Sequence, residues 1–225
     1  MKSSEAVFFT EKEFMVLCFF CGLEKLRCFE LPDPDALTDE DMTMALWNLV
    51  NRGFLRSDGK RFLPEKKADL LIEPMTFPSV MMLTPADPDV SQKLCYHGST
   101  VTVLERDRLR KDQIRLESVT FEELREQTEE LFGMESYDRQ DAELLLTASS
   151  LCSDELERLR KGKEEDLRLL LEAEIRTAEK TGRYRFLRGA ICTFVTNPDD
   201  PENESGIYDA KFWNAIRDML KGGEK

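Results

Sequence analysis

The chain has 225 residues and a formal net charge of −13 at pH 7, with 32 basic and 45 acidic side chains. An acidic protein repels phosphates, so this balance disfavours nucleic acid and anionic membranes as partners. No stretch approaches the roughly 20 apolar residues of a membrane-spanning helix. Acidic side chains interrupt the N-terminal segment where a signal peptide would be apolar. The sequence therefore predicts a cytoplasmic protein.

The cysteines favour structural roles over chemistry. Six are present, Cys18, Cys21, Cys28, Cys95, Cys152 and Cys192. Most of them lie in apolar helical or strand patterns, where a thiol behaves as a small hydrophobic group. Cys18 and Cys21 have C-x-x-C spacing, but they fall inside a helical pattern and not at the helix N-terminus that lowers a thiol pKa. Cys28 and the single His97 do not complete a zinc site at a recognisable spacing. We predict no metal site and no cofactor, with redox and metal binding as the alternatives.

The first 75 residues predict a helix, a loop, a second helix, a short hairpin and a third helix, which is the outline of a winged-helix unit. Thr10 and Glu13 have the spacing of a capping box and begin the first helix. Pro32 and Pro34 are expected to end it.

The second helix is expected to begin at Thr38 and to end at Gly53, a residue suited to a helix C-terminus. A hairpin with an Asp-Gly turn follows over residues 54–63. Pro64 then opens a third helix, and Pro74 closes it.

Winged helices often bind DNA, so the charge of this unit matters. Residues 1–73 hold 10 Lys and Arg against 14 Asp and Glu, a balance of −4. Asp39, Glu40 and Asp41 lie at the leading end of the second helix, where they would face the phosphates. We therefore favour a protein-binding unit. A DNA-binding transcriptional regulator is the alternative, supported by four basic residues around the hairpin: Arg52, Arg56, Lys60 and Arg61.

The remaining chain alternates between strand and helix patterns. Strands are predicted at 80–83, 93–97, 100–105, 113–119, 184–196 and 207–208. Helices are predicted from Thr120 to Gly133, around 142–146, over 155–180 and over 211–220. The 155–180 helix is expected to carry the apolar stripe Leu156, Leu159, Leu167, Leu170, Leu171 and Ile175, with Gly162 as a possible division. The last helix is expected to turn Phe212, Ala215, Ile216 and Met219 inward.

Together these elements predict an α+β fold with a central mixed or antiparallel sheet flanked by helices. We divide the chain into a winged-helix-like part (1–75), a first β-rich half with its helix (76–135) and a second half (136–225), within one compact domain. Residues 100–121 and 185–212 follow a similar order of strand, loop, short strand and helix. Either two pseudo-symmetric halves or chance similarity explains that order.

No residue pattern predicts catalysis. The chain lacks a glycine-rich phosphate loop, a G-x-S-x-G motif and an H-E-x-x-H motif. His97 is expected at the surface beside the turn at Gly98. The predicted function is a non-enzymatic protein-binding module of unknown oligomeric state. Its candidate partner-binding surface lies on two neighbouring strands, at Leu94, Tyr96, Val101 and Val103, beside the loops 85–92 and 197–206.

The order of elements resembles the EspG family, the cytosolic chaperones of type VII (ESX) secretion, and small uncharacterised proteins encoded near Gram-positive type VII loci. The residues that carry this resemblance are Thr10–Leu17, Ala45–Phe54 and the helix from Leu63 to Pro74 before the strand at Met81–Leu83. The resemblance implies pseudo-symmetric halves around a mixed sheet. It also implies a non-enzymatic protein that holds the tip of a secreted helical-bundle substrate in the cytosol.

Overall fold

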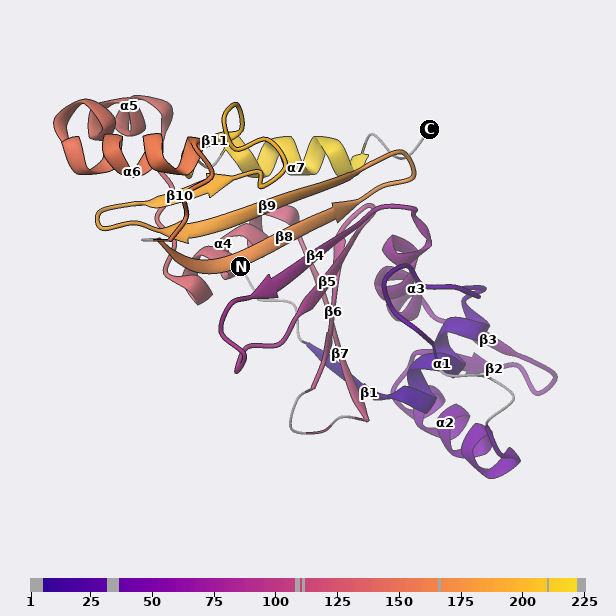
Figure 1. The fold of residues 1–225 in the computed structure, drawn as a ribbon. Coiled ribbons are helices and arrows are strands. Elements are labelled where there is room, and N and C mark those ends of the chain that lie inside the picture. The colour runs from indigo at the N-terminus through magenta and orange to yellow at the C-terminus, as the bar shows by residue number, and fades with distance from the viewer. Residues whose placement is uncertain are drawn as a thin grey trace. The chain divides into compact units, whose positions relative to one another are not determined.

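The chain is α+β, as predicted, in a computed structural model (Figure 1). The structure describes residues 6–31, 37–107, 110, 112–165, 167–209 and 211–221. Two compact units are present: unit 1 comprises Met1–Val80 and Lys93–Thr120, and unit 2 comprises Met81–Gln92 and Phe121–Gly223.

The N-terminal part of unit 1 contains three α-helices, a hairpin and a 3₁₀ turn. Their bounds are α1 (Glu11–Phe20), α2 (Asp39–Asn51), β2 (Leu55–Ser57), β3 (Phe62–Pro64), α3 (Lys66–Ile72) and the turn Glu73–Thr76. The predicted caps are confirmed, because the Thr10 and Thr38 side chains accept from the third backbone N–H of their helices. Gly53 follows α2 with a φ of +71°, a conformation that glycine adopts without steric cost.

Two predicted helix boundaries in this part are wrong. The first helix ends at Phe20, because Gly22 takes a φ of +74° and turns the chain. Pro32 and Pro34, which we expected to end it, lie outside the described residues. Pro64 is the last residue of β3 and does not open α3, which begins two residues later at Lys66.

Unit 1 also contains four antiparallel strands of the nine-stranded sheet formed by the described residues. Their order is β1-β7-β6-β5, with the bounds Val7–Thr10 for β1, Lys93–His97 for β5, Val101–Arg106 for β6 and Gln113–Val119 for β7. The last three strands were predicted, but β1 was not. Only four residues long, β1 ends at Thr10, the N-cap residue of α1, and the sequence signals at this position are those of a helix start.

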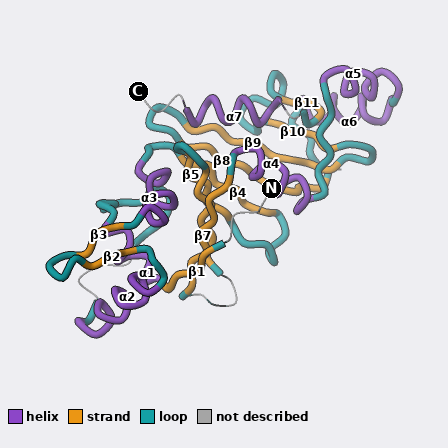
Figure 2. The backbone as a smooth tube through the Cα atoms, turned by 180° about the vertical axis from the view of Figure 1, so that it is seen from behind, coloured by secondary structure: helices purple, strands orange, loops and turns teal. Residues whose placement is uncertain are grey.

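Unit 2 contains five strands in the order β4-β8-β9-β10-β11 and four helices. The strands are β4 (Val80–Pro85, its first residue assigned to unit 1), β8 (Arg168–Arg176), β9 (Thr181–Arg188), β10 (Thr193–Thr196) and β11 (Ser205–Ile207). The helices are α4 (Phe121–Phe132), α5 (Arg139–Ala148), α6 (Ser150–Arg160) and α7 (Lys211–Lys221). Figure 2 shows α7 running along this sheet, and Phe212 of α7 contacts the rings of Tyr184 and Phe186 on β9.

The predicted helix over 155–180 is wrong in its second half. Helix α6 ends at Arg160, and residues 168–176 form β8. Within β8 the buried residues are Leu171, Ala173 and Ile175, which alternate as in a strand with one covered face. The leucines of this region fit both the helical period of 3.6 residues and the strand period of two. Pairing with β9 selects the strand.

Two smaller predictions in unit 2 also need correction. The single strand expected over 184–196 is a hairpin of β9 and β10, closed by a hydrogen bond from the Gly189 N–H to the Cys192 carbonyl at 2.9 Å. In α7, Ala215 is exposed, whereas Trp213, which we did not place inside, is buried.

Replacing Gly162 with alanine is expected to lower the free energy of unfolding by about 1–2 kcal/mol. Gly162 follows α6 with a φ of +72°, and no atom lies within 4 Å of the position that a Cβ would occupy. The loss of stability therefore comes only from forcing alanine into a backbone conformation with positive φ. Urea denaturation of the two proteins measures it, with Gly206→Ala as the control, since a Cβ there also meets open space but no positive φ is required. Equal effects of the two substitutions would contradict this explanation.

Candidate functional site

The predicted partner-binding surface is not a surface. Leu94, Tyr96, Val101 and Val103 are all exposed by 5% or less. The prediction failed because β5 and β6 are buried on both faces, which the sequence pattern of short β-rich runs does not reveal. Tyr96 is fixed in the interior, where its hydroxyl donates to the Arg27 carbonyl at 2.7 Å.

His97 was expected at the surface, but it is buried at the end of β5. Its position follows from the close packing of the adjacent turn. A Cβ built at Gly98 would lie 2.9 Å from the side chains of Glu73 and Phe77, so only glycine fits there. The turn beside His97 is therefore covered by the 3₁₀ segment of the same unit.

The cysteines form no disulfides, and the surroundings of the C-x-x-C pair oppose thiolate chemistry. All six are free. Cys18 lies in α1 and Cys21 is its C-terminal cap residue. Burial raises the pKa of the Cys21 thiol to about 12 and raises the pKa of Cys18 further above its usual range. Because the thiolate is the nucleophile and the metal ligand, this C-x-x-C pair is suited to packing.

In the described part of the chain, no group of three or more His, Cys, Asp or Glu side chains could hold a metal ion. The acidic loop 197–206 instead forms a turn held by its own polar groups. The Asp199 N–H donates to the Asn197 side chain at 2.9 Å, and the Asn203 amide donates to Asp200 at 3.0 Å. The Asp200 carboxylate therefore serves the loop conformation.

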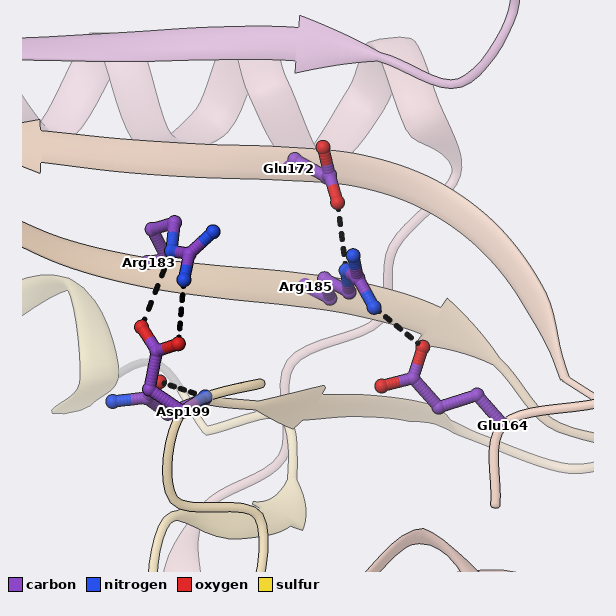
Figure 3. Close-up of polar contacts among 6 residues, drawn as sticks. Glu164, Glu172, Arg183, Arg185 and Asp199 are labelled. Carbon is purple, nitrogen blue, oxygen red and sulfur yellow. Dashed lines mark hydrogen bonds and ion pairs between the residues drawn. The ribbon is translucent and has the colours of Figure 1, made fainter. Parts of the chain in front are cut away.

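A row of ion pairs crosses the polar face of β8 and β9 in unit 2 (Figure 3). Arg185 stands opposite Glu172 in the strand register and donates to it at 2.6 Å, and it also donates to Glu164 at 3.1 Å. Arg183, two residues away on the same face, donates twice to Asp199, at 2.5 and 3.2 Å. The two arginines thus tie the loops at 164 and 199 to the strands.

Two hollows lie on this charged face. The smaller, of about 170 Å³, includes Thr84, Glu172 and Arg183 in its lining, and the larger, of about 540 Å³, includes Leu167 and Arg185. Hydrogen bonding to Asp199 raises the pKa of Arg183, and hydrogen bonding to Glu172 raises that of Arg185. Because both guanidinium groups already bind carboxylates, neither hollow offers an uncommitted cation to an anionic ligand.

The most apolar hollow of the three lies on α5, also in unit 2. It has a volume of about 310 Å³ and is lined by Tyr137, Asp141, Leu144, Leu145 and Ala148. We call it the α5 groove. No side chain of α5 is buried, and Leu144 is 64% exposed. A leucine this exposed, inside an apolar concavity, is typical of a surface that another molecule covers.

The α5 groove is open because of the sequence of the helix. Three consecutive leucines, 144 to 146, span about 200° of a helix at 100° per residue, so they cannot all face the same core. Leu145 and Leu146 pack toward the buried cluster that contains Cys152 and Leu156 of α6. Leu144 is left outside. This run of leucines was the signal in the sequence that could have located the groove.

Comparison with known proteins adds no functional assignment. No known protein family matches this sequence, and no curated protein is significantly similar to it. Among the described residues, no helix is long and apolar enough to cross a membrane.

Proposed function

We propose that the protein is a non-enzymatic, cytoplasmic protein-binding module that holds a helix of its partner in the α5 groove. The observation that carries this proposal is the largely apolar lining of the groove, in which Leu144 is exposed. The resemblance to the EspG family suggests which partner this is. It would be a helical substrate of type VII secretion, and the protein would hold the tip of that substrate.

The spacing along α5 supports a helical partner. Asp141, Leu144, Leu145 and Ala148 follow the i, i+3, i+4, i+7 pattern of one helix face, so they form a stripe along the axis. Such a stripe packs best against a second helix with apolar residues at the same period. Asp141 at the edge of the stripe favours a partner with a basic or hydrogen-bond-donating side chain there.

The chain order supports the pseudo-symmetric halves that the resemblance implies. Four consecutive strands followed by a helix occur twice, as β4 to β7 with α4 and as β8 to β11 with α7. Each series is preceded by helices, which are α1 to α3 in the first case and α5 and α6 in the second.

Ion pairs in the hairpin and at the end of α2 favour a protein partner over DNA. Arg61 pairs with Asp58 at 3.3 Å, Arg56 with Glu65 at 3.5 Å, and Arg52 with Glu13 at 3.2 Å. Cations that already pair with carboxylates release fewer counterions from DNA, so they add little affinity. The alternative of a DNA-binding regulator therefore gains no support from this part of the chain.

Co-expression with small helical proteins encoded beside its gene, followed by affinity capture on the full chain, tests the proposal. Leu144→Glu is expected to reduce capture by at least about tenfold, because it places a charge in the apolar contact. Leu151→Glu is the matched control, since Leu151 is an exposed leucine on α6 that does not line the groove.

The proposal fails if Leu144→Glu captures as much partner as the unmodified chain. It also fails if capture requires no helical protein, or if the chain instead shifts duplex DNA in a salt-dependent manner.

A further inference from the structure

A second candidate contact surface lies on α2, in unit 1, and stands independently of the α5 groove. Two large side chains one turn apart point away from the protein: Met44 is 56% exposed and Trp47 is 63% exposed. Tryptophan is normally well buried, because it removes more apolar area from water than any other residue. The indole N–H of Trp47 has no hydrogen-bond partner among the described residues.

The folding of α2 does not require these two side chains. The opposite face of the helix is its core face, where Ala45 and Leu49 are buried. The polar contacts with α1 use other side chains: Lys12 pairs with Asp41 at 2.6 Å, and Asn48 donates to Glu13 at 2.8 Å. A surface helix position that packing does not decide usually holds Ala, Lys or Glu. Met and Trp there point to a contact made with another molecule.

Carboxylates lie at one end of the exposed pair. Asp39 and Glu40 lie in the first turn of α2, both exposed, with Glu40 four residues before Met44. Neither carboxylate has an ion-pair partner in the described part of the chain, because Lys12 is engaged by Asp41. Helix α2 itself contains no lysine or arginine. The face formed by Asp39, Glu40, Met44 and Trp47, here called the α2 face, is therefore apolar at its centre and negative at one end.

We propose that the α2 face binds a cationic amphipathic helix of a partner protein. Apolar side chains of that helix pack on Met44 and Trp47, and its lysine or arginine side chains pair with Asp39 and Glu40. A guanidinium or ammonium group over the indole of Trp47 adds a cation–π contact. Charge selects this occupant, since a second copy of the α2 face offers no lysine or arginine to pair with Asp39 and Glu40, and nucleic acid would be repelled by these carboxylates.

Binding of a synthetic peptide to the full chain tests the proposal. The probe is a short fluorescein-labelled helix with leucine on one face and lysine along its flanks, and its comparison peptide carries glutamate in place of every lysine. Fluorescence anisotropy is expected to show at least about tenfold tighter binding of the lysine peptide.

Two variants locate the contact. Trp47→Ala is expected to weaken binding of the lysine peptide by at least about tenfold, since exposed aromatic anchors dominate such contacts. The double variant Asp39→Asn with Glu40→Gln is expected to remove most of the preference for the lysine peptide. Leu70→Ala, which removes another exposed apolar side chain of unit 1, is the matched control and is expected to leave both affinities unchanged.

Tryptophan emission gives an independent readout. The chain has two tryptophans, and Trp213 is only 2% exposed, so iodide quenching reports on Trp47. The lysine peptide is expected to protect this emission from iodide.

The proposal is overturned if the two peptides bind equally, if Trp47→Ala binds like the unmodified chain, or if quenching is unchanged by the peptide. A concentration-dependent dimer that Trp47→Ala abolishes would assign the α2 face to a second copy of the chain and would equally overturn it. Leu144→Glu is expected to leave peptide binding intact, so failure of this proposal is distinguishable from failure at the α5 groove.

Discussion

Replacing Trp213 with alanine is expected to lower the free energy of unfolding by about 3–5 kcal/mol. Trp213 is the largest fully buried side chain and lies between two aromatic rings, with centroids 5.8 Å from Phe121 and 6.5 Å from Phe186. Its indole N–H donates to the Tyr208 hydroxyl, which in turn donates to Glu129 at 2.6 Å. Alanine leaves a cavity among these rings and removes the donor to Tyr208, and urea denaturation measures the sum.

Trp213→Phe separates these two effects. Phenylalanine keeps most of the ring contacts and loses the hydrogen bond, so an intermediate loss of about 1–2 kcal/mol is expected. Asn214→Ala is the control, because Asn214 is exposed in the same helix and its loss is expected to change stability by less than about 0.5 kcal/mol. If Trp213→Ala behaved like Asn214→Ala, α7 would not be anchored through this ring cluster.

Replacing Glu13 with alanine is the second large effect, expected to lower the free energy of unfolding by about 2–4 kcal/mol. Glu13 is buried, and its carboxylate accepts from the Thr10 N–H at 3.0 Å, from the Asn48 amide at 2.8 Å and from the Arg52 guanidinium at 3.2 Å. Alanine therefore removes half of the α1 capping box and both polar contacts to α2. Arg52 is about one-third exposed, so water offsets part of its loss.

Urea denaturation also measures this effect, with Glu24→Ala as the control. Glu24 is exposed, and the described residues show no contact of its carboxylate. Glu13→Gln keeps an acceptor for the Thr10 N–H but loses the charge, so about half of the destabilisation is expected. A similar small effect for Glu13→Ala and Glu24→Ala would show that α1 and α2 are held by apolar packing alone.

Local signals in the sequence were sufficient for much of unit 1. Capping residues act within one helical turn, so Thr10, Thr38 and Gly53 locate helix ends without knowledge of the rest of the fold. The Asp-Gly turn at residues 58–59 located the hairpin for the same reason. The α+β class followed from these elements and the strands at 93–119.

Features that depend on distant contacts were not predictable in this way. Residues 168–176 satisfy helical spacing, and only the partner strand β9 makes them extended. The burial of Leu94 and Tyr96 depends on segments far away in the sequence, as the contact of Tyr96 with Arg27 shows. For the candidate sites, a sequence shows which side chains are apolar but not which of them the fold leaves exposed to solvent. Leu144 and Trp47 were therefore missed as exposed groups.

The absence of buried side chains in α5 affects how its groove receives a partner. Little apolar area fastens this helix, so its local unfolding requires much less free energy than unfolding of a buried strand such as β10. A receptor element of this kind changes its tilt and its side-chain rotamers at small cost. It can therefore accommodate partner helices of different sequence, with part of the interaction free energy spent on ordering α5 itself.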